Sequence, residues 1–208
     1  MPHHRRAACP PSHTPTRRLR RPRLLIVGCG DVGQRVARGL AGRLNLRALT
    51  SRAEQVGPLR ALGLVPLRGD LDDPRSLRRI GALAPRVLHL APPPSLGDDD
   101  PRTAHLLQAL ARHPAPGRRL VYGSTSGVYG DAGGARFDET RPVAPATARA
   151  RRRVAAEQRL RDAGRRGLAA TVLRIPGIYA GDRPGGHPRE RLARGTPVLR
   201  AEDDVHTN

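Results

Sequence analysis

The chain has 208 residues and a formal net charge of +20, and each of its 38 basic residues is an arginine. A charge of this size is typical of nucleic-acid-binding proteins. The complete absence of lysine is instead typical of GC-rich codon usage, so we do not expect a nucleic-acid partner. No apolar run is long enough to span a membrane. The two cysteines, Cys9 and Cys29, indicate no disulfide framework and favour the cytoplasm.

A buried strand followed by a glycine-rich turn opens the folded part of the chain. The four apolar residues 24–27 predict a parallel strand, and Val32, Val36 and Leu40 recur on one face of a following helix. The turn between them has the G-x-G-x-x-G spacing, formed by Gly28, Gly30 and Gly33. In this context the spacing predicts dinucleotide binding, with the diphosphate at the helix N-terminus near Asp31 and Val32. The alternative is an ordinary glycine-rich turn.

Strands and helices alternate along the rest of the chain. Further strands are predicted at 44–49, 64–67, 87–91, 119–122 and 169–174, and further helices at 53–62, 74–83, 101–113 and 146–164. Two Asp-Pro pairs, Asp73-Pro74 and Asp100-Pro101, are typical of a helix cap followed by proline at the first helical position. The alternation predicts an α/β fold with a doubly wound parallel sheet of Rossmann type.

Composition and pattern divide the chain into three parts. Residues 1–22 are rich in Pro, His and Arg without any acid, which predicts a disordered basic tail. Residues 23–174 form the predicted dinucleotide-binding domain. We interpret residues 175–208 as the start of a smaller lobe, and because 197–208 lack a closing helix we expect the chain to be cut within it.

Motifs in the second half of the chain resemble those of one family. Ser-Thr-Ser-Gly-Val-Tyr-Gly at 124–130, with Asp-Glu-Thr-Arg-Pro at 138–142, is similar to the extended short-chain dehydrogenase/reductases, the NAD-dependent epimerase/dehydratase family. The segments 89–91 and 173–179 fit the same family. The resemblance covers about residues 23–208, the N-terminal part of a typical member. The G-x-G-x-x-G spacing resembles the atypical members.

The resemblance implies a nicotinamide dinucleotide cofactor, NADP or NAD, and a small carbonyl, hydroxyl or sugar-type substrate. It places Asp70, Leu71 and Ala91 around the dinucleotide together with the three glycines; the alternative for Asp70 is a bond to a loop amide. The second strand ends without an acid that would hold a ribose 2′-hydroxyl, and Arg52 is placed to meet a 2′-phosphate. We therefore expect NADP, although Arg52 is also explained as one more solvated arginine.

The catalytic residues of the family are matched only in part. Thr125 matches the Ser/Thr that hydrogen-bonds the reacting oxygen of the substrate; its alternative role is to cap a turn. The Tyr-x-x-x-Lys pair is missing, because counting back from Glu157, usually acidic in the family, places Arg153 and Arg149 at the positions of Lys and Tyr. Arg153 can supply charge to the nicotinamide ribose, but a guanidinium is a poor proton shuttle. Tyr129 is the nearest substitute acid.

We therefore expect an NAD(P)-dependent oxidoreductase or epimerase/dehydratase-like protein with non-standard proton chemistry; the alternative is a non-catalytic NADP(H) sensor or scaffold. The arginines of the 146–164 helix form a solvated face, or hold a phosphorylated or nucleotide-sugar substrate or nucleic acid. His89 is interpreted as a core residue. No metal site is expected, because a polar loop and a helix cap explain the acidic residues 98–100. Family members often form dimers, so a homodimer is an assembly that the resemblance implies.

Overall fold

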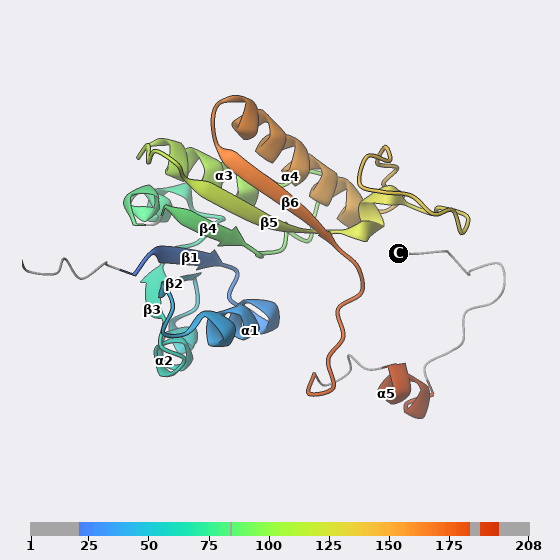
Figure 1. Ribbon diagram of the computed structural model, residues 1–208, viewed down its shortest axis with the longest axis horizontal. Helices are drawn as coiled ribbons and strands as arrows, with labels where there is room; N and C mark the ends of the chain where they lie inside the picture. Colours follow the sequence, from blue (N-terminus) through green and yellow to red (C-terminus); the bar gives the residue numbers. More distant parts are fainter. Residues whose placement is uncertain (1–20, 84, 184–187, 196–208) are drawn as a thin grey trace, which may run out of the picture.

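Six parallel strands form a single sheet in the computed structural model, which describes residues 21–83, 85–183 and 188–195. The strand order is β3-β2-β1-β4-β5-β6 (Figure 1). The strands are β1 (Arg23–Val27), β2 (Asn45–Thr50), β3 (Val65–Arg68), β4 (Arg86–His89), β5 (Arg119–Thr125) and β6 (Ala169–Ile175). This topology confirms the predicted doubly wound sheet of Rossmann type.

Helices cover both faces of the sheet. The α-helices are α1 (Asp31–Leu40), α2 (Val56–Ala61), α3 (Pro101–Ala111), α4 (Ala148–Arg165) and α5 (Pro188–Ala193). In Figure 1, α1 and α2 lie on one side of the sheet and α3 and α4 on the other. Alternate residues of β1 feed both layers, because Leu25 and Val27 join the core cluster under α3 and α4, whereas Leu24 and Ile26 join the cluster under α1 and α2. A strand buried on both faces needs the continuous apolar run seen in the sequence.

The segment predicted as one helix at 74–83 forms short 3₁₀ helices instead. Its predicted cap is present, because the Asp73 carboxylate accepts a hydrogen bond from the Arg75 N–H at 3.0 Å. Two 3₁₀ helices follow, η2 (Pro74–Leu77) and η3 (Ile80–Ala82). The buried Leu77 ends η2 and the buried Ile80 begins η3, and both join the core cluster under α3.

The other predicted elements are present with shifted ends. The helix predicted at 53–62 is η1 (Ala53–Gln55) followed by α2. The strand predicted at 119–122 continues to Thr125, because it stays paired with β6 as far as Ile175. A short helix, η4 (Ser126–Tyr129), follows directly. Because the strand is longer, Ser124 and Thr125 lie at the end of the sheet formed by the carboxyl ends of its strands.

The acidic residues 98–100 tie the start of α3 to α4. Asp100 caps α3, since its carboxylate accepts hydrogen bonds from the N–H and the hydroxyl of Thr103 at 3.2 and 2.6 Å. The other two acids form ion pairs with α4, Asp98 with Arg151 at 2.9 Å and Asp99 with Arg159 at 2.6 Å. These carboxylates therefore join α4 to the segment that starts α3. Within the described ranges, no three His, Cys, Asp or Glu side chains group as metal ligands.

Parts of the predicted terminal segments lie outside the described residues. These are the tail from residue 1 to residue 20 and the end of the second lobe at 196–208. Of the segment predicted as a lobe, Ile175 belongs to β6, residues 176–183 form no helix or strand, and Pro188–Ala193 form α5. None of the helices described here is long and apolar enough to cross a membrane.

Candidate functional site

A cleft lies where the central strands β1, β2, β4 and β5 end. The chain runs from β1 to β2 on one side and returns to β4 on the other. Open parallel sheets bind ligands at such a switch point, outside the carboxyl ends of the strands. The cleft consists of a first hollow of about 450 Å³ and a second of about 380 Å³. Leu90 lines both, so the two hollows adjoin.

The first hollow is built on the glycine turn between β1 and α1. Gly28 has a φ of 86°, and a Cβ on it would lie 2.2 Å from the backbone nitrogen of Ala91. A Cβ on Gly33 would lie 3.1 Å from the Gly28 carbonyl oxygen, so the helix packs closely on the turn. A Cβ on Gly30 would meet no atom within 4 Å. The turn therefore leaves open space at Gly30, beside the N-terminus of α1, which suits a diphosphate.

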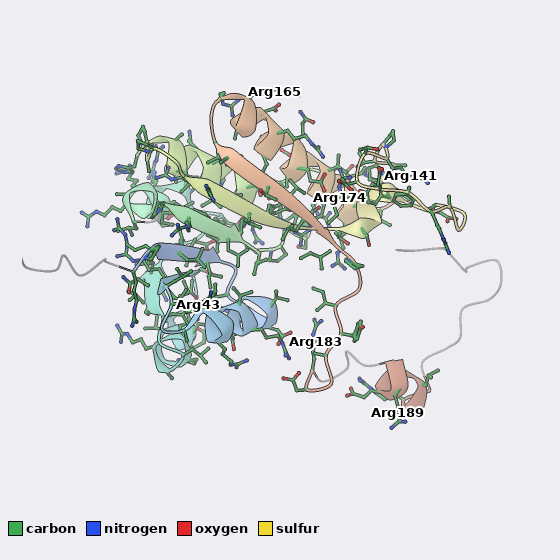
Figure 2. The ribbon with its side chains drawn as sticks, viewed as in Figure 1. Arg43, Arg141, Arg165, Arg174, Arg183 and Arg189 are labelled. Carbon is green, nitrogen blue, oxygen red and sulfur yellow. The ribbon has the colours of Figure 1, made fainter. Side chains whose placement is uncertain are left out.

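The start of α1 is tied to the segment that follows β6. The Asp31 carboxylate pairs with Arg35 at 3.1 Å and with Arg183 at 3.4 Å, and Arg35 also pairs with Asp182 at 2.9 Å. Figure 2 shows Arg183 on this segment, which runs from β6 past α1. Asp31 therefore uses its side chain to fix the segment. The N–H groups of the first helical turn have no partner within the helix and suit a phosphate.

Two arginines line the first hollow, and they differ in how firmly they are held. Arg102 donates to both carboxylate oxygens of Asp72 at 2.8 and 2.6 Å and to the Pro92 carbonyl at 3.1 Å. These hydrogen bonds lower the pKa of the Asp72 carboxyl. Arg52 is exposed, and its ion pair with Glu54 is long, 3.8 Å. Arg52 is therefore the guanidinium here that is most open to a phosphate. The sequence did not single out Arg102, whose partner lies 30 residues away.

Asp70, Leu71 and Ala91, which were also predicted around the dinucleotide, line the first hollow, whereas Val32 lines the second. Leu71 and Ala91 are buried and form part of the wall of the first hollow. The Asp70 carboxylate accepts a hydrogen bond from the Asp72 N–H at 2.9 Å, which is its loop-amide alternative. Cys29 lines the hollow as well, and burial raises the pKa of its thiol.

The second hollow lies at the ends of β4, β5 and β6. Its polar side chains are hydroxyls and guanidinium groups, from Ser124, Thr125, Arg149, Arg153 and Arg183. The residues known to line it include no phenol, imidazole, thiol or carboxylate. General acid–base groups of the usual kinds are therefore missing from this lining.

Thr125 and Arg153, both predicted to be catalytic, meet at the second hollow. The Thr125 hydroxyl accepts a hydrogen bond from the Gly127 N–H at 3.3 Å, so Thr125 caps η4 while it lines the hollow. Arg153 donates to the Tyr122 hydroxyl at 3.0 Å and to the Gly123 carbonyl at 2.7 Å. Burial raises the pKa of Tyr122 to about 12, although Arg153 opposes this effect. The Tyr122 phenol therefore stays protonated at neutral pH.

Tyr129, the predicted substitute acid, does not line the second hollow. It is buried and lines a third hollow of about 680 Å³. Its hydroxyl accepts a hydrogen bond from Arg174 at 2.6 Å, and its ring meets the Phe137 ring edge-on with centroids 4.8 Å apart. Figure 2 shows Arg174 on β6. The structure thus brings Thr125 and Arg153 together but leaves Tyr129 in a neighbouring site.

Glu157 is a buried acid that holds the end of β5. Its carboxylate is fully buried and accepts hydrogen bonds from Ser124 at 2.6 Å, Arg174 at 2.8 Å and Arg161 at 2.9 Å. Burial acts to raise the pKa of this carboxyl, but the hydrogen bonds from Arg174 and Ser124 outweigh it, and the pKa is lowered. Because Ser124 directly precedes Thr125, Glu157 fixes the strand end that presents Thr125.

His89 is a core residue, as predicted. It is buried, and its Nε2 lies 2.9 Å from the Thr103 hydroxyl. Burial, helped by the charge of Arg153, lowers the pKa of His89 to about 3, so the imidazole is neutral at physiological pH. Its ring lies 5.1 Å from the Tyr122 ring and lines neither of the two cleft hollows.

Comparison with known families agrees with this architecture. Residues 24–201 match the family described as NAD dependent epimerase/dehydratase. The chain belongs to this family. No curated protein matches the chain.

Solved structures with this epimerase/dehydratase fold include proteins from several bacteria. A conserved protein of unknown function from Silicibacter pomeroyi DSS is 32% identical, with a TM-score of 0.66 over 85% of this chain and 58% of that one. UDP-glucose 4-epimerase from Thermus thermophilus, in complex with NAD, is 26% identical, with a TM-score of 0.65 over 85% and 64%. A short-chain dehydrogenase/reductase superfamily protein from Agrobacterium tumefaciens with bound NAD, 24% identical with a TM-score of 0.58 over 73% and 48%, shares the fold. The chain therefore spans less than two thirds of each of these proteins.

Arg149 and Arg153, predicted from the sequence to occupy the positions of the family's Tyr-x-x-x-Lys pair, lie near the start of α4. Both line the second hollow together with Thr125. A guanidinium group is a poor proton shuttle.

Proposed function

We propose that this protein is an oxidoreductase or epimerase/dehydratase-like enzyme that uses NADP in preference to NAD and acts on a small carbonyl, hydroxyl or sugar-type substrate. The proposal depends on the glycine turn, where a Cβ is excluded at Gly28 and has free space at Gly30. The residues proposed to hold the dinucleotide are Gly28, Gly30, Asp31, Val32, Gly33, Arg52, Asp70, Leu71 and Ala91. The preference for NADP rests on Arg52, the exposed guanidinium of the first hollow.

In this proposal the bound dinucleotide supplies hydride chemistry through its nicotinamide ring. Thr125 donates a hydrogen bond to the reacting oxygen of the substrate. Arg153 binds the nicotinamide ribose, and its charge stabilises the negative charge that develops on that oxygen. The proton is exchanged with water, because the hollow offers no phenol or imidazole among its known lining residues. Tyr129 would have to leave Arg174 to act as the substitute acid.

The experiment that tests cofactor binding is a fluorescence titration with NADPH and with NADH. The wild-type chain is expected to bind NADPH more tightly. Gly30→Val is expected to abolish binding, because its side chain fills the space left for the diphosphate. Gly39→Val is the matched control, since Gly39 is exposed on the same helix and a Cβ there also meets no atom within 4 Å. Equal binding by both variants, or none by the wild type, contradicts the proposal.

A non-catalytic NADP(H) sensor or scaffold is the second candidate. It is favoured by the second hollow, whose known lining lacks the usual proton-transfer groups. Steady-state turnover with a panel of carbonyl compounds separates the two candidates. NADPH oxidation that is lost in Thr125→Ala and kept in Thr125→Ser supports the enzyme. Tight NADPH binding without turnover on any compound supports the sensor.

Three further expectations stay predictions. They are a cytoplasmic location, a homodimer, and a substrate lobe that begins at residue 175. Light scattering on the purified chain tests the homodimer, and fluorescence microscopy of the tagged protein tests the location. Limited proteolysis tests the lobe, since a boundary near residue 175 predicts a protected fragment that ends there.

A further inference from the structure

We propose that Arg149 and Arg153, the latter through donors that it does not use for the nicotinamide ribose, form a site for an oxyanion of the substrate, a carboxylate or a phosphate group. The substrate is then a small hydroxy or keto compound that carries this group close to its reacting carbon. The inference deepens the proposed function and rests on it. It arises from the charges that surround the second hollow, two of which pair with no carboxylate among the described residues.

The two arginines lie on the same face of α4. They are four residues apart, which places both side chains on the hollow beside Thr125. Arg149 is exposed and makes no hydrogen bond or ion pair with any described residue. Arg153 donates only to the neutral oxygens of Tyr122 and Gly123, and its Nε has no partner among the described atoms. Two guanidinium charges thus face one hollow, and no carboxylate of the described part of the chain pairs with them.

Most other arginines of α4 are paired with carboxylates. The pairs are Arg151 with Asp98, Arg159 with Asp99, Arg161 with Glu157, and Arg165 with Asp162. Arg152 donates to the carbonyl of Gly97 at 2.6 Å. None of these five arginines is among the known lining residues of the two cleft hollows. Arg149 and Arg153, which face the second hollow, are left for a ligand.

The charge of the second hollow favours an anion. No acid is among its known lining residues, and Arg183 shares its charge with Asp31 at 3.4 Å. Guanidinium groups match carboxylate and phosphate geometry, and such charge-assisted hydrogen bonds are the stronger kind. An uncharged sugar would leave the charges of Arg149 and Arg153 uncompensated.

The position of the site assigns the anion to the substrate. The glycine turn and Arg52, which are proposed to hold the phosphates of the dinucleotide, line the first hollow. Thr125, which is proposed to hold the reacting oxygen, lines the second hollow together with Arg149 and Arg153. At about 380 Å³, this hollow is at the small end of ligand pockets. An anion on the arginines is therefore only a few bonds away from the oxygen on Thr125.

The test measures binding of two probes to the full chain by isothermal titration calorimetry. The probes are lactate, a hydroxy acid, and inorganic phosphate, and the tighter one identifies the group that the site prefers. Arg149→Gln is expected to weaken the preferred probe about tenfold or more, because charge-assisted hydrogen bonds are lost. Arg152→Gln is the matched control and is expected to stay within about twofold, since it removes the same charge from a position outside the hollow.

Several outcomes overturn the proposal. Equal loss in both variants assigns the binding to the general positive charge of the chain. No binding of either probe to the wild type rejects the site. NADPH is titrated into the same variants. If Arg149→Gln loses affinity for NADPH but not for the probe, Arg149 binds the dinucleotide and not the substrate. If the wild type binds the probe but not NADPH, the proposed function fails and the site remains an anion site without a substrate role.

Discussion

Arg174 on β6 donates hydrogen bonds to both carboxylate oxygens of Glu157 on α4, at 3.2 and 2.8 Å. The Glu157 side chain is 0% exposed and that of Arg174 is 13% exposed. Arg174 also donates a hydrogen bond to Tyr129, and Glu157 also accepts one from Ser124. The pair therefore joins β6, α4 and the end of β5. Removing either partner leaves the other charge in the interior without compensation.

We therefore expect Glu157→Ala to be strongly destabilising, by about 3–5 kcal/mol, the range for a broken buried ion pair. Urea denaturation measures the loss. Asp162→Ala on the same helix is the control, because Asp162 pairs with the exposed Arg165, and surface pairs contribute about 0–1 kcal/mol. Similar losses in the two variants would show that the buried pair contributes no more to the free energy of unfolding than the surface pair does.

The geometry of the glycine turn predicts that alanine substitutions at Gly28 and Gly30 change the stability by very different amounts. Gly28→Ala is expected to reduce the free energy of unfolding by about 3 kcal/mol or more, because the residue has a φ of 86° and its Cβ would overlap the backbone of Ala91. Gly30→Ala is expected to change it by less than about 1 kcal/mol, because its Cβ meets no atom within 4 Å. Thermal unfolding followed by circular dichroism compares them, and equal stability would contradict the observed turn geometry.

The sequence predicted the fold well because its first strand, β1, is buried on both faces of the sheet. A run such as residues 24–27 has no polar residue, so it reads as a central parallel strand without knowledge of its neighbours. The prediction failed at 74–83, since the cap at Asp73 and the proline after it mark a helix start but do not select its type. Packing of Leu77 and Ile80 under α3 is a tertiary property.

The candidate site was predictable where the backbone carries the signal. The glycine spacing located the first hollow, and the motif at 124–130 located Thr125 at the second. Arg102 was missed because its partner Asp72 becomes a neighbour only after folding. The burial of Glu157 was also not predictable, since one acid among many arginines gives no sign of which face it occupies.

Arg52 is expected to set the cofactor preference. Arg52→Ala should weaken NADPH binding about tenfold or more and leave NADH binding nearly unchanged, because only NADPH carries the 2′-phosphate that the guanidinium would bind. Arg60→Ala is the control, since Arg60 is also exposed but does not line the first hollow. Fluorescence titration of both cofactors gives the ratio. An equal loss for NADH and NADPH would show that Arg52 does not recognise the 2′-phosphate.

The buried His89 is expected to make the fold less stable in mild acid. Its pKa is about 3 in the folded chain, because it is buried, whereas an unfolded histidine has a pKa of about 6.5. Between these values the unfolded chain binds a proton that the folded chain does not, so the free energy of unfolding falls as the pH falls below about 6.5.

Each pH unit in this window contributes about 1.4 kcal/mol, or about 2 kcal/mol between pH 6.5 and pH 5. His89→Gln, whose side-chain amide can still reach the Thr103 hydroxyl, removes the titrating group and is expected to lose less stability over this range. Urea denaturation of both proteins at pH 7.5 and pH 5 measures the difference, and the other histidines contribute equally to both. The same acid-induced loss in the variant would show that His89 is not the group responsible.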